Sequence, residues 1–159
     1  ATTEIYTLSL HDALPISDYL FKLNLENVHV HGFVDSASDF MQQYDLMLVP
    51  LLSGGGMRVK IIEGMALSKC IVSTSVGAEG IDCENGRNIL ICNTPDEWIS
   101  TIANYFHDTS IGQVIGENAK RLVDQKYKNK IVIKKFIDLY RSLLAGSERA
   151  TNTDMLSIN

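Results

Sequence analysis

A short apolar run that ends in proline and three glycines constrains the fold of this chain more than any other feature. Residues 46–49 are a continuous apolar stretch of the kind that forms a buried parallel strand, and Pro50 follows them. Gly54, Gly55 and Gly56 then allow a tight backbone path, and helical periodicity begins near residue 57. A strand, a glycine loop and a helix in this order predict one unit of a parallel α/β sheet.

The rest of the chain repeats this alternation of strand and helix signals. Thr94 and Pro95 followed by two acids are a strong helix start, because they supply a cap, a first-turn proline and charges that suit the helix dipole. The pattern predicts an α/β fold in which a parallel sheet carries helices on both faces. Strands are predicted at residues 28–34, 45–49, 70–74 and 88–91, and helices at residues 36–43, 57–67, 94–107, 111–125 and 129–144. In the helix of residues 57–67, the core face is predicted to carry Met57, Ile61, Ile62 and Met65.

The composition is that of an ordinary globular domain. Of the 159 residues, 45% are hydrophobic and 21% charged, so one domain with a buried core is expected. The net charge of −5 argues against nucleic acid as a partner, and no apolar run reaches the length of about 18 residues that predicts a transmembrane segment. Cys70, Cys83 and Cys92 fit neither a disulfide framework nor a zinc site, which indicates a reducing, cytoplasmic setting and no bound metal.

The first residues differ in character from the rest of the chain. Residues 6–16, Tyr-Thr-Leu-Ser-Leu-His-Asp-Ala-Leu-Pro-Ile, resemble the in-frame translation of a common short-read sequencing adapter. We therefore expect residues 1–16 to be an artefactual segment, to be set aside like a tag, and the chain to be a truncated fragment. A domain truncated at its N-terminus is predicted over residues 17–145, and a disordered polar tail over residues 146–159.

The glycine loop and the helix after it together suggest a ligand site. The free amides and the dipole at a helix start favour an anion such as a diphosphate, and Arg58 adds positive charge there. Glu63, further along the same helix, can accept hydrogen bonds from sugar hydroxyls. A second loop with Gly77, Glu79 and Gly80 leaves the next predicted strand at the same edge of the sheet, where open α/β sheets bind ligands. These features predict one nucleotide-sugar cleft.

Five stretches of the chain carry a family resemblance. They are residues 30–34, 44–50, 54–66 (Gly-Gly-Gly-Met-Arg-Val-Lys-Ile-Ile-Glu-Gly-Met-Ala), 71–80 (Ile-Val-Ser-Thr-Ser-Val-Gly-Ala-Glu-Gly) and 86–90. These stretches resemble the C-terminal, donor-binding half of GT-B glycosyltransferases, and most closely the retaining family 4, the group 1 glycosyl transferases. The resemblance covers about residues 28–144 and implies an incomplete Rossmann-like half-domain, in which only the last four of six strands ordered 3-2-1-4-5-6 are present.

The resemblance also implies roles for individual residues. Glu63 matches the glutamate that accepts hydrogen bonds from the ribose hydroxyls of the nucleotide, whereas Gly55 stands where the family often carries a first glutamate. No metal and no cofactor are implied, because basic side chains and the helix dipole take the place of a cation at the leaving diphosphate. The donor contacts are expected from Gly54, Gly55, Gly56, Met57, Arg58, Glu63 and Glu79.

The implied activity is transfer of a sugar from a nucleotide diphosphate-sugar to an acceptor with retention, in polysaccharide biosynthesis. The acceptor, a sugar or a lipid-linked sugar, is expected to bind through a missing N-terminal domain, so this fragment alone should be inactive. A cytoplasmic location, or attachment at the inner face of the membrane, is implied. Two alternatives stay open: a non-catalytic nucleotide-sugar-binding module, which Gly55 leaves possible, and another GT-B enzyme such as a sugar-nucleotide epimerase.

Structural interpretations compete with some of these assignments. Glu63 could pair with Lys60 on a solvated helix face instead of binding a ligand, and Glu79 could cap a turn instead of contacting the nucleotide. His29 and His31 alternate with apolar residues on one strand and are interpreted as structural. That strand is expected to lack its usual neighbours, so it could pair with residues 5–10 or with the strand that begins near Leu46.

Overall fold

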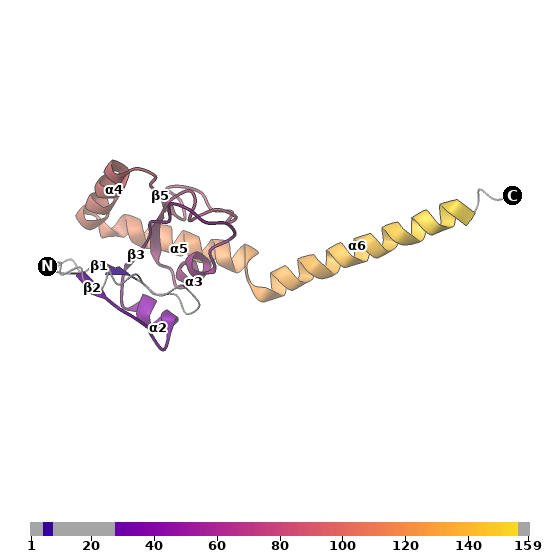
Figure 1. Cartoon of the computed structure of the whole chain (residues 1–159), viewed down its shortest axis with the longest axis horizontal. Coiled ribbons are helices and arrows are strands. Elements are labelled where there is room, and N and C mark those ends of the chain that lie inside the picture. Colours follow the sequence, from indigo (N-terminus) through magenta and orange to yellow (C-terminus); the bar gives the residue numbers. More distant parts are fainter. Residues whose placement is uncertain (1–4, 8–27, 156–159) are drawn as a thin grey trace. The chain divides into compact units, whose positions relative to one another are not determined.

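The chain divides into two compact units, residues 1–44 and residues 45–159. The computed structural model describes residues 5–7 and 28–155 (Figure 1). Each unit is described by itself below. The predicted boundaries at residues 16 and 145 differ from this division and stay predictions.

The first unit contains a small parallel pairing. Strand β1 (Ile5–Thr7) pairs in parallel with β2 (Val28–Val30), and Ile5 lies opposite Val28. The prediction that a segment near residue 5 pairs with the strand at residue 28 is therefore confirmed over three residues; residues 8–10 lie outside the described residues. Two short strands alone are marginally stable, so this pairing contributes little by itself.

A short helix completes the described part of the first unit. Helix α2 (Ala37–Gln42) begins after Ser36, whose hydroxyl accepts a hydrogen bond from the Asp39 amide at 3.2 Å and so caps the helix. The ring of His31 packs edge-on against Phe40 with centroids 5.2 Å apart, which suits the structural interpretation of this histidine.

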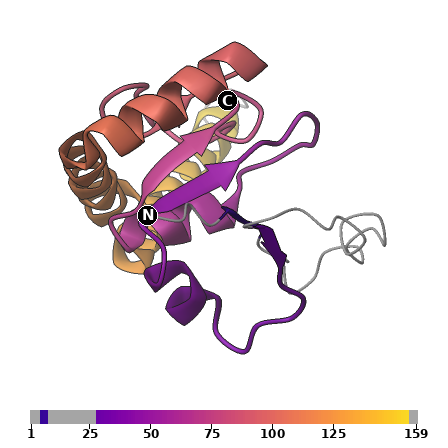
Figure 2. The same cartoon turned by 90° about the vertical axis from the view of Figure 1, so that its left-hand side faces the viewer.

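The second unit is built on a parallel sheet with the strand order β3-β4-β5. The strands are β3 (Leu46–Val49), β4 (Cys70–Ser73) and β5 (Leu90–Ile91), and Figure 2 shows two of them side by side and pointing the same way. Leu46 lies opposite Cys70 in the register. All four residues of β4 are buried, as expected for the central strand of a parallel sheet. The predicted α/β class is confirmed.

Helices follow these strands at the predicted places, with shifted ends. They are α3 (Val59–Ala66), α4 (Pro95–His107), α5 (Thr109–Lys126) and α6 (Asn129–Met155). Helix α5 begins two residues earlier than predicted, because Asp108 caps it by accepting a hydrogen bond from the Ser110 amide at 3.0 Å. Helix α6 continues to Met155 rather than ending at Leu144, so residues 146–155 are helical where an irregular tail is predicted. Extending an existing helix costs less than starting one, which explains how a polar segment joins it.

The helices cover both faces of the sheet, as predicted. A Cβ built on Gly64 of α3 would lie 2.7 Å from the sulfur of Met47 and 3.1 Å from Cδ1 of Ile71, so this helix packs closely on β3 and β4. The neighbouring Cys70 points to the opposite face, where it clusters with Tyr105 of α4 and Ile115 of α5. No helix in the described part of the chain has the length and apolar character needed to cross a membrane.

The start of α4 forms the predicted capping box. The Thr94 hydroxyl accepts from the Glu97 amide at 3.4 Å, and the Glu97 carboxylate accepts in return from the Thr94 amide at 3.0 Å. The carboxylate also accepts from the amide of Asn93 at 2.6 Å, and these backbone hydrogen bonds lower the pKa of Glu97 below its ordinary value.

Candidate functional site

Two loops leave neighbouring strands at the same edge of the sheet. One spans residues 50–58 after β3, and the other spans residues 74–80 after β4. Because β3 and β4 are parallel and Val49 lies opposite Ser73, both loops begin at the same level of the sheet. The predicted juxtaposition of the glycine loop with the loop that carries Glu79 is therefore present at the level of the backbone.

Hydrogen bonds join the starts of the two loops. The Thr74 hydroxyl donates to the Leu51 carbonyl and accepts from the Gly77 amide at 3.0 Å. The Ser73 hydroxyl donates to the Val49 carbonyl at 3.3 Å. A Cβ on Gly77 would lie 2.3 Å from the Ser73 hydroxyl oxygen, so a glycine is needed for this approach. The backbone at the strand ends is thus fixed by buried hydroxyls rather than by solvent.

Further out, the loops meet through Gly80 and Met57. Gly80 has φ +78°, and a Cβ built on it would lie 3.4 Å from the Met57 Cβ. Glu79, next to this contact, is exposed, and its amide donates to the Val76 carbonyl at 3.4 Å. The Glu79 carboxylate is therefore accessible from solvent beside the glycine loop, while its backbone takes part in a turn.

The glycine loop itself is exposed and carries a folded-back arginine. Gly54 and Gly56 have φ of +135° and +81°, which only glycine adopts easily. Arg58 donates from Nη1 to the Gly55 carbonyl at 2.8 Å, and a Cβ on Gly54 would lie 2.1 Å from Arg58 Nη2. Arg58 Nε is buried and has no hydrogen-bond partner within the described residues. A cationic group with one unsatisfied donor thus lies directly over the glycine backbone.

Met57 differs from its predicted position. It was expected on the core face of the helix, but Arg58 adopts an extended conformation and α3 begins only at Val59. Met57 therefore stays in the loop, where 45% of its surface is exposed, while Ile61 and Met65 are fully buried as predicted. The expectation that Met57 belongs to the core is wrong, and its exposure leaves it available at the site.

The N-terminal half of α3 carries a charged pair. Lys60 donates to Glu63 Oε2 at 2.8 Å, which is the helix-face pairing that the sequence allows. Glu63 is half-buried, and its Oε1 accepts no hydrogen bond from the residues that the structure describes. The helix has no side-chain cap at its start; the Ile61 amide donates to the Arg58 carbonyl at 3.0 Å, while the two helical amides before it remain available to an anion. The pair with Lys60 and a contact to a ligand hydroxyl are therefore compatible.

The cysteines are structural. Cys70 and Cys92 are buried, and burial raises the pKa of the Cys70 thiol to about 11. The Cys92 thiol lies 3.2 Å from the Thr101 hydroxyl. Over residues 5–7 and 28–155, no three His, Cys, Asp or Glu side chains are grouped as a metal site would require.

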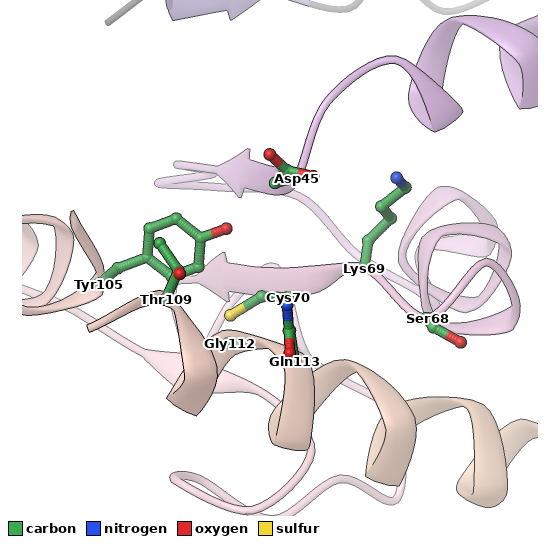
Figure 3. Close-up of a pocket in the computed structure, with 8 residues that line it drawn as sticks. All are labelled: Asp45, Ser68, Lys69, Cys70, Tyr105, Thr109, Gly112 and Gln113. Carbon is green, nitrogen blue, oxygen red and sulfur yellow. The ribbon is translucent and has the colours of Figure 1, made fainter. Parts of the chain in front are cut away.

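A cavity at the other edge of the sheet is not suggested by the sequence motifs. It has a volume of about 210 Å³ and lies where β3 and β4 begin (Figure 3). One signal could have indicated it, because Asp45 begins one predicted strand and Lys69 stands directly before the next, so both must lie at the same edge of a parallel sheet. The lining residues are Asp45, Ser68, Lys69, Cys70, Tyr105, Thr109, Gly112 and Gln113.

Comparison with known proteins relates the chain to larger ones. It is 30% identical over 123 residues to an uncharacterized 44.6 kDa protein in the cps region of Klebsiella pneumoniae, which covers 74% of this chain and 32% of that protein. It is 25% identical over 146 residues to the capsular polysaccharide biosynthesis glycosyltransferase CapM of Staphylococcus aureus, covering 91% and 38%. The chain spans about a third of the length of the curated relatives it matches.

The fold also matches a solved structure. The crystal structure of Anabaena Alr3699/HepE in complex with UDP superimposes with a TM-score of 0.67 at 20% identity, covering 73% of this chain and 32% of that one. At this identity the match is evidence for the fold alone. A family model described as glycosyl transferases group 1 matches residues 13–108, more than half of the chain. The chain therefore belongs to the glycosyl transferases group 1 family.

Proposed function

We propose that this chain is the donor-binding part of a glycosyltransferase and that the two joined loops bind a nucleotide diphosphate-sugar. The observation that carries the proposal is the contact between the glycine loop and the loop of Gly77–Gly80 at one sheet edge, beside the uncapped start of α3. The family membership and the UDP bound in the Anabaena structure support this ligand class.

Each group at the site has a role in this proposal. The exposed amides of Gly55, Gly56 and Met57 and the start of α3 hold the diphosphate, because they present donors and the positive end of the helix dipole. Arg58 leaves the Gly55 carbonyl and contacts the diphosphate, which satisfies its buried Nε. Glu63 accepts from ribose hydroxyls with the oxygen that Lys60 does not occupy.

The reaction proposed for the larger protein is transfer with retention. The bond between the anomeric carbon and the diphosphate oxygen breaks, a bond to the acceptor oxygen forms, and the proton of the acceptor hydroxyl passes to the departing nucleoside diphosphate. The amides and Arg58 stabilise the charge that develops on the departing diphosphate. Electrostatic stabilisation of this kind is usually the largest single contribution of a protein to the rate of such a step. We propose that the chain alone binds donor without turnover, with the acceptor held by further parts of the longer protein.

Binding of UDP to the purified 159-residue chain tests the donor site. We expect measurable binding by isothermal titration calorimetry. The variant Glu63→Gln should bind about 10–100-fold more weakly, since hydrogen bonds to a charged group contribute about 1.5–3 kcal/mol. The matched control is Glu117→Gln, because Glu117 is also a helical glutamate in an ion pair, with Arg121 on α5, and lies outside the loops.

Two results would contradict the proposal. If neither UDP nor a guanosine or adenosine diphosphate binds to the folded chain, the two loops do not form a donor site. If Glu63→Gln and Glu117→Gln bind UDP as tightly as the unchanged chain, Glu63 serves only its pair with Lys60.

One observation favours the alternative of a non-catalytic nucleotide-sugar-binding module. Gly55 has open space around its Cα, and its carbonyl accepts from Arg58, so no carboxylate stands at this position of the loop. A full-length protein that binds the donor but gives no transfer or hydrolysis would support this alternative.

A further inference from the structure

A second candidate site lies at the opposite edge of the sheet from the glycine loops. Asp45 precedes β3, Lys69 precedes β4, and both line the cavity of about 210 Å³ together with Tyr105 of α4 and the first turn of α5 (Figure 3). The glycine loops follow the other ends of the same strands. Strand β3 has four residues, so about 13 Å of strand separates the two places.

One side chain that lines the cavity carries a hydroxyl without a protein partner in the described part of the chain. Tyr105 is only 8% exposed, and its hydroxyl makes no hydrogen bond with the residues that the structure describes. Figure 3 shows this hydroxyl pointing into the space between Asp45 and Cys70. This hydroxyl is therefore able to donate a hydrogen bond to an acceptor placed in the cavity.

The position of Tyr105 is fixed by packing. A Cβ built on Gly112 would lie 2.3 Å from Cε2 of Tyr105, so the glycine lets the ring lie flat against α5. The ring of Phe106 packs edge-on at 5.4 Å. Burial, and the nearby charge of Asp45, raise the pKa of Tyr105 above its ordinary value, which keeps the phenol protonated and able to donate at neutral pH.

The lining groups define the chemistry of a ligand. Asp45 offers an acceptor, and Thr109 and Gln113 each offer a donor and an acceptor. The formal charges of Asp45 and Lys69 cancel, so the cavity favours neither a phosphate nor a cation. Hydroxyl groups, which donate and accept at once, match such a mixed set. The volume lies below the roughly 300–1,000 Å³ of ordinary ligand pockets, which limits the ligand to about one small ring.

We propose that this cavity is a second small-molecule site, separate from the donor loops, which binds an uncharged polyol such as one hexose unit through Tyr105 and Asp45. The proposal does not depend on the donor site, because no residue of the cavity belongs to the loops of residues 50–58 or 74–80. In a chain that handles sugars, such a site would hold a carbohydrate away from the position of transfer.

Saturation-transfer-difference NMR with methyl α-D-glucopyranoside tests the proposal on the 159-residue chain. We expect transfer to the sugar, with a dissociation constant in the millimolar range. The variant Tyr105→Phe removes only the hydroxyl and should weaken binding at least about 5-fold, the loss of one hydrogen bond. The matched control Tyr140→Phe changes a tyrosine on α6 that is 65% exposed and lies outside the cavity, and should bind normally.

The remaining outcomes are also decisive. Saturating UDP should leave the sugar signals unchanged; displacement of the sugar by UDP would place it at the donor loops and overturn the proposal. Absence of transfer to the glucoside, or equal binding by Tyr105→Phe and the unchanged chain, would overturn it as well. If the ¹H–¹⁵N spectrum shows that Tyr105→Phe does not fold, Asp45→Asn takes its place, because Asp45 is exposed and the same loss is expected.

Discussion

Replacing Gly116 with alanine should loosen the crossing of α5 over the turn between α3 and β4. A Cβ built on Gly116 would lie 2.0 Å from the Ser68 carbonyl oxygen and 2.8 Å from its carbon, whereas Cβ atoms do not approach other atoms closer than 3.0 Å. Both obstructing atoms belong to the main chain, so neither can rotate away. The helix must therefore shift by about 1 Å, which disturbs the packing of Ile115 against Cys70.

The magnitude follows from two opposing effects. Overpacking of this kind costs about 1–3 kcal/mol, and the rigid obstacle places Gly116→Ala at the upper end of that range. Alanine also stabilises the helix by up to about 1 kcal/mol relative to glycine, because its helix propensity is higher. The net loss of about 2 kcal/mol in the free energy of unfolding corresponds to a melting temperature roughly 4–8 °C lower for a chain of this size.

Thermal unfolding followed by circular dichroism at 222 nm measures this loss. The matched control is Gly55→Ala, because a Cβ on Gly55 would meet no atom within 4 Å, and its melting temperature should stay unchanged. A melting temperature of Gly116→Ala equal to or above that of the unchanged chain would refute the reasoning, since α5 would then not press against the Ser68 carbonyl.

Three further predictions concern the capping box of α4 and the cysteines. Thr94→Ala should lower the free energy of unfolding by about 1 kcal/mol in urea, because the cap is lost, while Thr94→Ser should keep most of it. The pKa of Glu97 is lowered in the folded state, so its contribution to stability is complete above the ordinary value of 4.5 and is lost as the pH falls through the lower folded value. The fall in stability between pH 5 and pH 3, measured by urea unfolding, should therefore be smaller in Glu97→Gln; an unchanged pH dependence would count against it. Cys83 is partly exposed and Cys70 is buried with its pKa raised to about 11, so a thiol reagent at pH 8 should label Cys83 first, and equal labelling rates would contradict the buried position of Cys70.

The strand positions and the fold class could be predicted from the sequence because their signals are local. Apolar runs such as residues 70–73 match the buried strands, and Thr94 and Glu97 mark a helix start with their own side chains. The start of α3 was misplaced because no Ser, Thr, Asp or Asn marks it; an extended Arg58 ends the loop instead. Met57 thereby moved from the expected core to the surface.

The candidate site was only partly predictable. That the two glycine-bearing loops share an edge follows from the parallel order of the strands. The folded-back position of Arg58 does not, because it depends on the positive φ values of Gly54 and Gly56. The cavity beside Tyr105 was missed because it depends on the fit of one ring to Gly112, across the break between α4 and α5. Such a fit leaves no periodic pattern in the sequence.

The contacts between the loops of residues 50–58 and 74–80 have a consequence for chimeric proteins. The Thr74 hydroxyl of the second loop donates to the Leu51 carbonyl of the first, and Gly80 of the second loop lies close to Met57 of the first. A recombinant protein that takes the loop of residues 50–58 from a relative and keeps its own loop of residues 74–80 would therefore lose both contacts. Exchange of specificity between relatives should succeed when the two segments are transplanted as one block, together with the strand ends at Val49 and Ser73 from which they start.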